Sequence, residues 1–185
     1  HKLDGPRGIG ALIVRAGVDL APQMHGGGHE GGLRSGTLNT PGAVGFGAAC
    51  TLARAEMAQW SAHCVALRDR FEAGLASDPE IVVFGQSRPR LPNTTQFAVP
   101  GYDGEAMVMA LDREGFAVSS GSACHSEHGE PSHVLLGMGI ERDLAKAAVR
   151  VSLGRHSTEA EVDALLAALA RILGREMAAK GVGRQ

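Results

Sequence analysis

Cys124 is the first candidate for chemistry, because it lies in a run of small and polar residues, Ser119-Ser120-Gly121-Ser122-Ala123-Cys124-His125-Ser126. A segment of this kind bends easily and leaves a sulfur accessible. The thiolate is the reactive form of cysteine, and a nearby cation lowers the pKa of the thiol. His125 and His128 can supply that charge. The loop context therefore favours a reactive Cys124 over a small buried side chain that packs as a hydrophobe.

Cys50 and Cys64 receive the opposite interpretation, because both fall within a stretch with a helical pattern. We expect each to be buried and to pack as a small apolar side chain. A metal site is a further alternative for the cysteine loop. Its candidate ligands are Cys124, His125, His128 and His133. Their spacing matches no common zinc pattern and no second cysteine is close, so we expect no metal there.

Lys2 is the second candidate and lies in His1-Lys2-Leu3-Asp4-Gly5-Pro6-Arg7-Gly8. A positioned and partly desolvated lysine amine forms a Schiff base with an aldehyde cofactor. The ordinary alternative is an exposed surface lysine. A Gly-Pro turn is weak evidence, so these residues alone favour the surface lysine.

Two arginines could hold anions. Arg34-Ser35-Gly36-Thr37 closes the Gly-rich segment 25–37, and its N–H groups, hydroxyl and guanidinium suit a phosphate. That signal is weak alone, and the ending of a Walker motif is absent. Arg150 stands within an apolar segment and requires an anionic partner. A substrate carboxylate is one candidate, and an internal salt bridge is the alternative that the residues alone favour.

The elements that must position these residues alternate between strands and helices. Apolar runs and turn residues predict strands at 9–14, 81–84, 94–99, 116–119 and 148–153. Helices are predicted at 41–76, 103–115 and 132–137, and after Thr158, which opens a capping box with Glu161. This alternation indicates an α/β or α+β domain. We expect a domain boundary within the long helix, near residues 45–60.

Composition narrows the function class. The 185 residues carry 18 basic and 20 acidic side chains, and no basic block indicates a nucleic-acid partner. No apolar run approaches the roughly 20 residues that span a bilayer, so we expect no membrane partner. Three scattered cysteines argue against a disulfide framework. A cytoplasmic protein in a reducing environment fits best.

Four segments together resemble the cysteine desulfurases, which belong to the class V aminotransferase group. The segments are His1-Lys2 with Gly5-Pro6-Arg7-Gly8, Gly26-Gly27-Gly28-His29-Glu30 with Arg34-Ser35-Gly36-Thr37, Ser119 to Cys124, and Arg150-Val151-Ser152 with Gly154-Arg155. They resemble the cofactor-lysine motif, the Gly-rich interface loop, the sulfur-acceptor loop and the C-terminal arginine motif of that family. Any one motif is only suggestive, and four in the same order make a specific signal.

The resemblance implies a role for each matching residue. Lys2 would carry pyridoxal phosphate, and His1 would touch that cofactor. Thr37 would reach the cofactor phosphate of a neighbouring subunit, so the enzyme would be a homodimer. Arg150 would hold the carboxylate of L-cysteine, and Cys124 would receive its sulfur, leaving L-alanine. The segment Glu130-Pro131-Ser132 resembles the family branch linked to iron–sulfur cluster assembly, so the partner would be a sulfur-acceptor or iron–sulfur scaffold protein.

The resemblance also implies an architecture. The fold would be α/β and would form the C-terminal part of an aspartate-aminotransferase-like, fold type I enzyme. Residues 1–50 would be the edge of the large cofactor domain, and residues 51–185 the small domain with the cysteine loop. Because the chain opens at His1 within a turn, we expect a preceding N-terminal portion, and we expect these 185 residues alone to be inactive. The alternatives are a non-catalytic sulfur-relay or scaffold fragment and a related lyase acting on selenocysteine.

Overall fold

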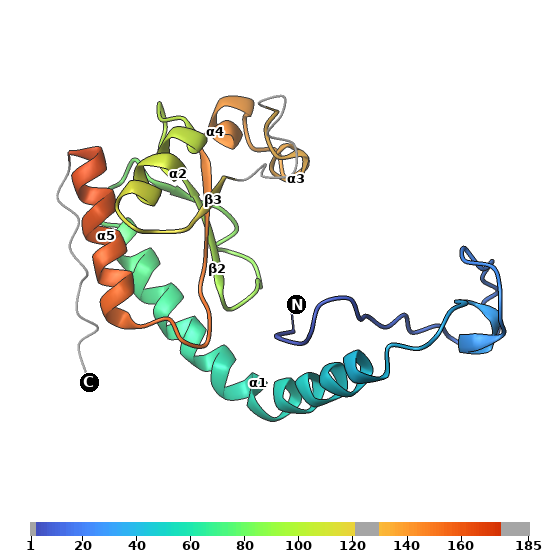
Figure 1. Cartoon of the computed structure of the whole chain (residues 1–185). Helices are drawn as coiled ribbons and strands as arrows, with labels where there is room; N and C mark the ends of the chain where they lie inside the picture. Colours follow the sequence, from blue (N-terminus) through green and yellow to red (C-terminus); the bar gives the residue numbers. More distant parts are fainter. Residues whose placement is uncertain (1–2, 121–129, 175–185) are drawn as a thin grey trace. The chain divides into compact units, whose positions relative to one another are not determined.

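The computed structural model describes residues 3–120 and 130–174, and the chain divides into two units, residues 1–58 and 59–185. The elements in chain order (Figure 1) are η1 (His29–Gly32), α1 (Thr40–Leu75), β1 (Val82–Val83), β2 (Thr94–Ala98), α2 (Gly104–Arg113), β3 (Ser119–Ser120), α3 (His133–Gly137), α4 (Arg142–Lys146), β4 (Ala148–Ser152) and α5 (Glu159–Leu173). The division falls within α1, between Ala58 and Gln59. The assignment of the two parts to a large and a small domain stays a prediction.

The N-terminal unit has little regular structure before α1. The predicted strand at residues 9–14 is wrong, because this segment is irregular and exposes Leu12 and Ile13 by 79% and 95%. A strand requires a neighbouring backbone to satisfy its N–H and C=O groups. None of the described segments pairs with residues 9–14. An apolar run alone therefore did not make a strand here.

The C-terminal unit is built on a four-stranded antiparallel sheet with the order β1-β2-β4-β3. The predicted strands at 81–84, 94–99 and 148–153 are confirmed as β1, β2 and β4. The strand predicted at 116–119 begins only at Ser119, as the two-residue β3. The register places Gln96 of β2 and Ser119 of β3 opposite Arg150 of β4.

One face of this sheet carries the main core. Phe97 of β2 and Val149 and Val151 of β4 point to the same side and pack with residues of α1, α2 and α5. The contributors from α1 are Leu67, Phe71 and Leu75, each at most 2% exposed. Burial of a large apolar side chain stabilises a fold by about 1.5–3 kcal/mol. This layer of helices therefore fixes the position of β2 and β4.

Among the described residues of the C-terminal unit, the helices that pack on the opposite face cover only one end of it. Leu135 of α3 and Ala145 of α4 pack with Ala98 and Ala148, which end the β2–β4 pair. Further along β4, Arg150 and Ser152 are exposed. This uncovered stretch, which we call the open face, is formed by Thr94, Gln96, Ser119, Arg150 and Ser152.

Two predicted helix starts are confirmed in atomic detail. The Asp103 side chain accepts hydrogen bonds from the N–H groups of Glu105 and Ala106 at the start of α2. Thr158 and Glu161 form the capping box that begins α5. The short helix α4 was not predicted. Of the helices in the described part of the chain, none is both long and apolar enough to cross a bilayer.

A buried ion pair ties α1 to the β1–β2 hairpin. The Glu72 carboxylate, with its side chain 9% exposed, accepts hydrogen bonds of 2.7 and 2.6 Å from Arg90 and one of 2.7 Å from the Thr95 hydroxyl. Burial by itself would raise the pKa of Glu72, but the hydrogen bonds from Arg90, Thr95 and Gln86 outweigh it and hold this pKa below its ordinary value. The pair therefore holds β2 from its core face, at Thr95.

Candidate functional site

The predicted site residues fall into three groups. Lys2, His1 and Cys124 lie outside the described residues, as do His125 and His128. Thr37 belongs to the N-terminal unit, and Arg150 belongs to the C-terminal unit.

Arg150 presents its side chain on the open face. Along β4, buried Val149 and Val151 alternate with exposed Arg150 and Ser152, as expected when successive side chains point to opposite sides of a strand. No carboxylate among the described residues forms an ion pair with Arg150, so the salt bridge that the residues alone favoured is not found there. Within the described part of the chain, no carboxylate competes with an external anion for the Arg150 guanidinium.

Two residues that sequence reasoning missed flank Arg150. Gln96 lies opposite it on β2 and Ser119 lies opposite it on β3. Directly opposed residues in an antiparallel pair share a face, with Cβ atoms about 4.5–5.5 Å apart. The alternation in 94–98 could have placed Gln96 on the polar face of its strand, but the sequence carries no signal for the pairing register.

The strand β3 connects this arrangement to the cysteine loop. Ser119 sits beside Arg150, and Ser120 is the last described residue before the segment that contains Cys124. Cys124 follows Ser120 by four positions, a length of chain that spans at most about 14 Å. The loop that carries the thiol is therefore anchored within a short reach of Arg150.

The Gly-rich segment folds into a loop closed by its own polar groups. The backbones of Met24 and Arg34 form a bridge, and the Ser35 hydroxyl donates a 3.0 Å hydrogen bond to the His25 carbonyl. Gly36 adopts a φ of +100°, a conformation that other residues rarely adopt. This glycine places Thr37 directly after the closed loop.

The donors that this loop leaves exposed fit a phosphate. Thr37 and Arg34 are both exposed, and Thr37 forms no hydrogen bond with any described residue. Among the described residues, the Arg34 guanidinium donates only to the neighbouring Ser35 carbonyl, at 3.1 Å. A free hydroxyl beside a cationic donor is the chemistry that binds a phosphate oxygen. This donor set fits the phosphate end of pyridoxal phosphate.

The segment that follows Lys2 is held on α1. Pro6 packs so closely against the helix that a Cβ added at Gly45 would lie 2.7 Å from the Pro6 Cγ. Gly5 lies against Phe46 and Ala49, and Ala49 is 8% exposed. This packing fixes the described half of the lysine motif to the helix that follows Thr37.

The two other cysteines differ from each other. Cys64 is fully buried in α1, as predicted, and burial raises the pKa of its thiol. The prediction for Cys50 is wrong, because its side chain is exposed. Few residues of the N-terminal unit are buried, so a helical position there does not imply a core position.

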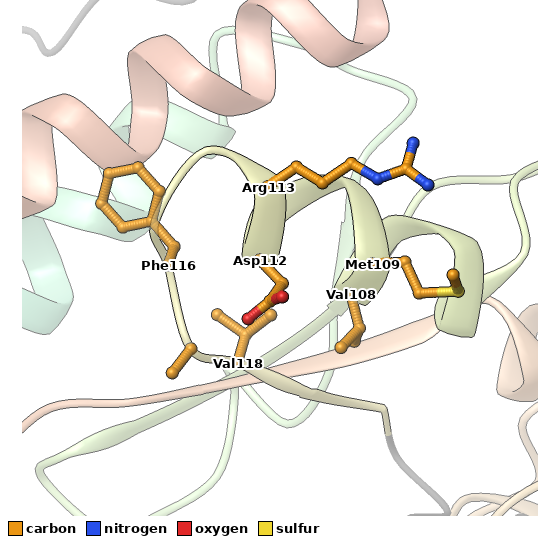
Figure 2. A pocket seen from close by; sticks show the side chains of 7 residues that line it. Val108, Met109, Asp112, Arg113, Phe116 and Val118 are labelled. Carbon is orange, nitrogen blue, oxygen red and sulfur yellow. The ribbon is translucent and has the colours of Figure 1, made fainter.

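A groove of about 380 Å³ lies beside α2 and the chain that leads to β3 (Figure 2). Its lining is Val108, Met109, Asp112, Arg113, Phe116, Ala117 and Val118. It contains none of the predicted site residues. The groove is therefore separate from the open face around Arg150.

Residues 1–165 match the family Aminotransferase class-V. The chain belongs to this family. This class-V aminotransferase chain is 49% identical over 166 residues to a "Cysteine desulfurase IscS" from Anaeromyxobacter sp. (strain Fw109-5), covering 88% of the chain and 41% of the relative. It is 47% identical to the protein of the same name from Colwellia psychrerythraea (strain 34H / ATCC BAA-681), over 88% of the chain and 40% of the relative.

A solved structure of a protein named "NIFS-LIKE PROTEIN" matches the class-V chain with a TM-score of 0.83 and 36% identity, covering 94% of this chain and 44% of that one. This likeness confirms the predicted α/β, fold type I architecture. The chain spans about two fifths of the length of the curated relatives that it matches.

Proposed function

We propose that this class-V aminotransferase is a pyridoxal-phosphate-dependent cysteine desulfurase that converts L-cysteine to L-alanine and leaves a persulfide on Cys124. The observation that carries the proposal is the open face, where an arginine without an ion partner among the described residues stands beside the strand that leads into the cysteine loop. The identity with proteins named cysteine desulfurase supports the same reaction.

Arg150 binds the substrate carboxylate in this proposal. A guanidinium offers parallel N–H donors that match both oxygens of a carboxylate. Because Arg150 lies in the middle of β4, between two buried valines, its Cα position is fixed by the core behind it. A carboxylate held there has a defined place relative to β3 and to the chain that continues to Cys124.

Lys2 and Thr37 hold the cofactor in this proposal. Lys2 would hold the cofactor of its own subunit through its amine and, once released, would move protons at the substrate α-carbon. Thr37 would donate its hydroxyl to the phosphate of the cofactor in the neighbouring subunit. His1 would contact the cofactor. Bound pyridoxal phosphate supplies an electron sink for the charge that develops at that carbon.

Cys124 completes the sulfur transfer. Its thiolate forms a bond to the substrate sulfur while the carbon–sulfur bond of the substrate breaks. The electron pair of that bond passes to the substrate carbon, which takes up a proton. One thiol and one L-cysteine thereby give one persulfide and one L-alanine, and no external oxidant is required.

The partners follow from the same reaction. A persulfide on Cys124 can be passed to a thiol of an acceptor protein, and we propose an iron–sulfur scaffold or another sulfur acceptor in this role. We also propose a homodimer in which Thr37 serves the neighbouring subunit. A reducing cytosol suits the reaction, because it keeps the acceptor thiol free.

The test uses the complete enzyme loaded with pyridoxal phosphate, L-cysteine and a reductant, with L-alanine and sulfide measured together. Cys124→Ala should abolish both products, because no thiolate remains to take the sulfur. Cys50→Ala is the matched control and should keep both, since Cys50 is an exposed cysteine outside the proposed site. Unchanged L-alanine formation by Cys124→Ala would refute the role of Cys124.

A further inference from the structure

We infer that Gln96 is a positioning residue for Arg150, and that its neutral amide keeps the guanidinium free for the substrate carboxylate. This inference rests on the proposed function of Arg150. Gln96 lies directly opposite Arg150 in the β2–β4 register, on the open face. Its side-chain amide forms no hydrogen bond with any described residue.

Gln96 is held in place from behind and from the side. Its neighbours Thr95 and Phe97 are 2% and 0% exposed on the core face, and Thr95 donates to the buried Glu72 carboxylate. The Gln96 carbonyl accepts a 2.9 Å hydrogen bond from the Phe84 N–H. The backbone at position 96 is therefore fixed relative to β4, and its side chain has few options other than the open face.

An amide side chain suits the position opposite Arg150. Its oxygen accepts from a guanidinium N–H, and its NH2 group donates to a carboxylate oxygen. An amide can therefore orient Arg150 and contact the bound anion without cancelling the positive charge. A carboxylate at position 96 would form an ion pair with Arg150 and would also repel the substrate carboxylate.

Ser119 on the other flank does not compete for this role. Its hydroxyl donates a 3.0 Å hydrogen bond to the Ser120 carbonyl. The Ser119 hydroxyl is therefore already bonded within β3. Of the two residues that flank Arg150, Gln96 is the one with a side chain long enough to reach the guanidinium.

The test is a charge change at constant shape. In the complete holoenzyme, Gln96→Glu should raise the KM for L-cysteine about tenfold, from the combined ion pair and repulsion, while kcat at saturating cysteine falls much less. The inhibition constant of L-alanine, which has the same carboxylate and no thiol, should rise by a similar factor. Gln96→Met, which removes the amide without adding charge, should raise both constants only a few fold.

Two further variants make the outcomes distinguishable. Ala160→Glu adds the same charge at an exposed position at the start of α5 and should leave both constants unchanged. Arg150→Ala tests the carboxylate site itself. If Arg150→Ala raises KM and Gln96→Glu does not, the role of Gln96 is refuted and the proposed function stands. If Arg150→Ala leaves KM unchanged, the proposed carboxylate site fails as well.

Discussion

Replacing Arg90 by alanine should destabilise the C-terminal unit far more than removal of a surface arginine. Arg90 is the bidentate partner of Glu72, whose side chain is 9% exposed. Loss of one partner leaves a charge that burial penalises, and such losses cost about 3–5 kcal/mol. Because the Arg90 side chain is itself 21% exposed, we expect the lower end, about 3 kcal/mol, with a melting temperature lower by about 10 °C.

The contribution of Glu72 to stability should change with pH in opposite directions in Arg90→Ala and in the unchanged protein. In the unchanged protein the pKa of Glu72 lies below its ordinary value of 4.5, so the pair stabilises fully above that value and less as the pH falls through the folded pKa. In Arg90→Ala, burial should dominate and raise the pKa of Glu72 above that of the unfolded chain. Acidification then protonates the buried carboxyl and reduces the difference between variant and unchanged protein.

Urea denaturation followed by far-ultraviolet circular dichroism, at several values between about pH 4 and pH 7, measures both effects. Arg171→Ala is the matched control, since Arg171 pairs with Glu114 on the surface with side chains 60% and 38% exposed. It should cost less than about 1 kcal/mol. Equal losses for the two variants, or a loss for Arg90→Ala that grows on acidification, would refute the reasoning.

Two further substitutions test how the helices are placed. Gly74→Ala should destabilise the C-terminal unit by about 1–3 kcal/mol in urea denaturation, because its Cβ would overlap Leu166, which is 1% exposed; an unchanged midpoint would show that α1 and α5 can separate freely. Thr158→Ala should cost about 1 kcal/mol through loss of the capping box at α5, and Thr158→Ser, which keeps the hydroxyl, should recover most of that loss in the same measurement.

The elements that the sequence predicts well carry their own local signals. Asp103 and Thr158 mark helix starts through side chains that reach N–H groups two or three residues away. In β4 the buried valines alternate with exposed polar residues, and in β2 Thr95 and Phe97 alternate with the less buried Thr94 and Gln96. These signals depend only on residues a few positions apart, so they can be recognised without the tertiary structure.

The errors and omissions concern partners that the local sequence does not encode. The segment 9–14 has the composition of a strand but no strand beside it among the described residues. Cys50 lies on α1 but is exposed, so its helical position does not make it a core residue. The bond between Glu72 and Arg90 joins residues 18 positions apart, and the pairing of Gln96 with Arg150 depends on strand register. Each requires the tertiary arrangement before it can be recognised.

The central claim is that sulfur moves from L-cysteine to Cys124. The most direct measurement is mass spectrometry of the complete holoenzyme after reaction with L-cysteine in the absence of reductant, with L-alanine quantified in the same sample. We predict a mass increase of one sulfur atom on the peptide that contains Cys124, in a ratio of one to the L-alanine formed in the first turnover. L-alanine formed without any added sulfur on that peptide would contradict the account.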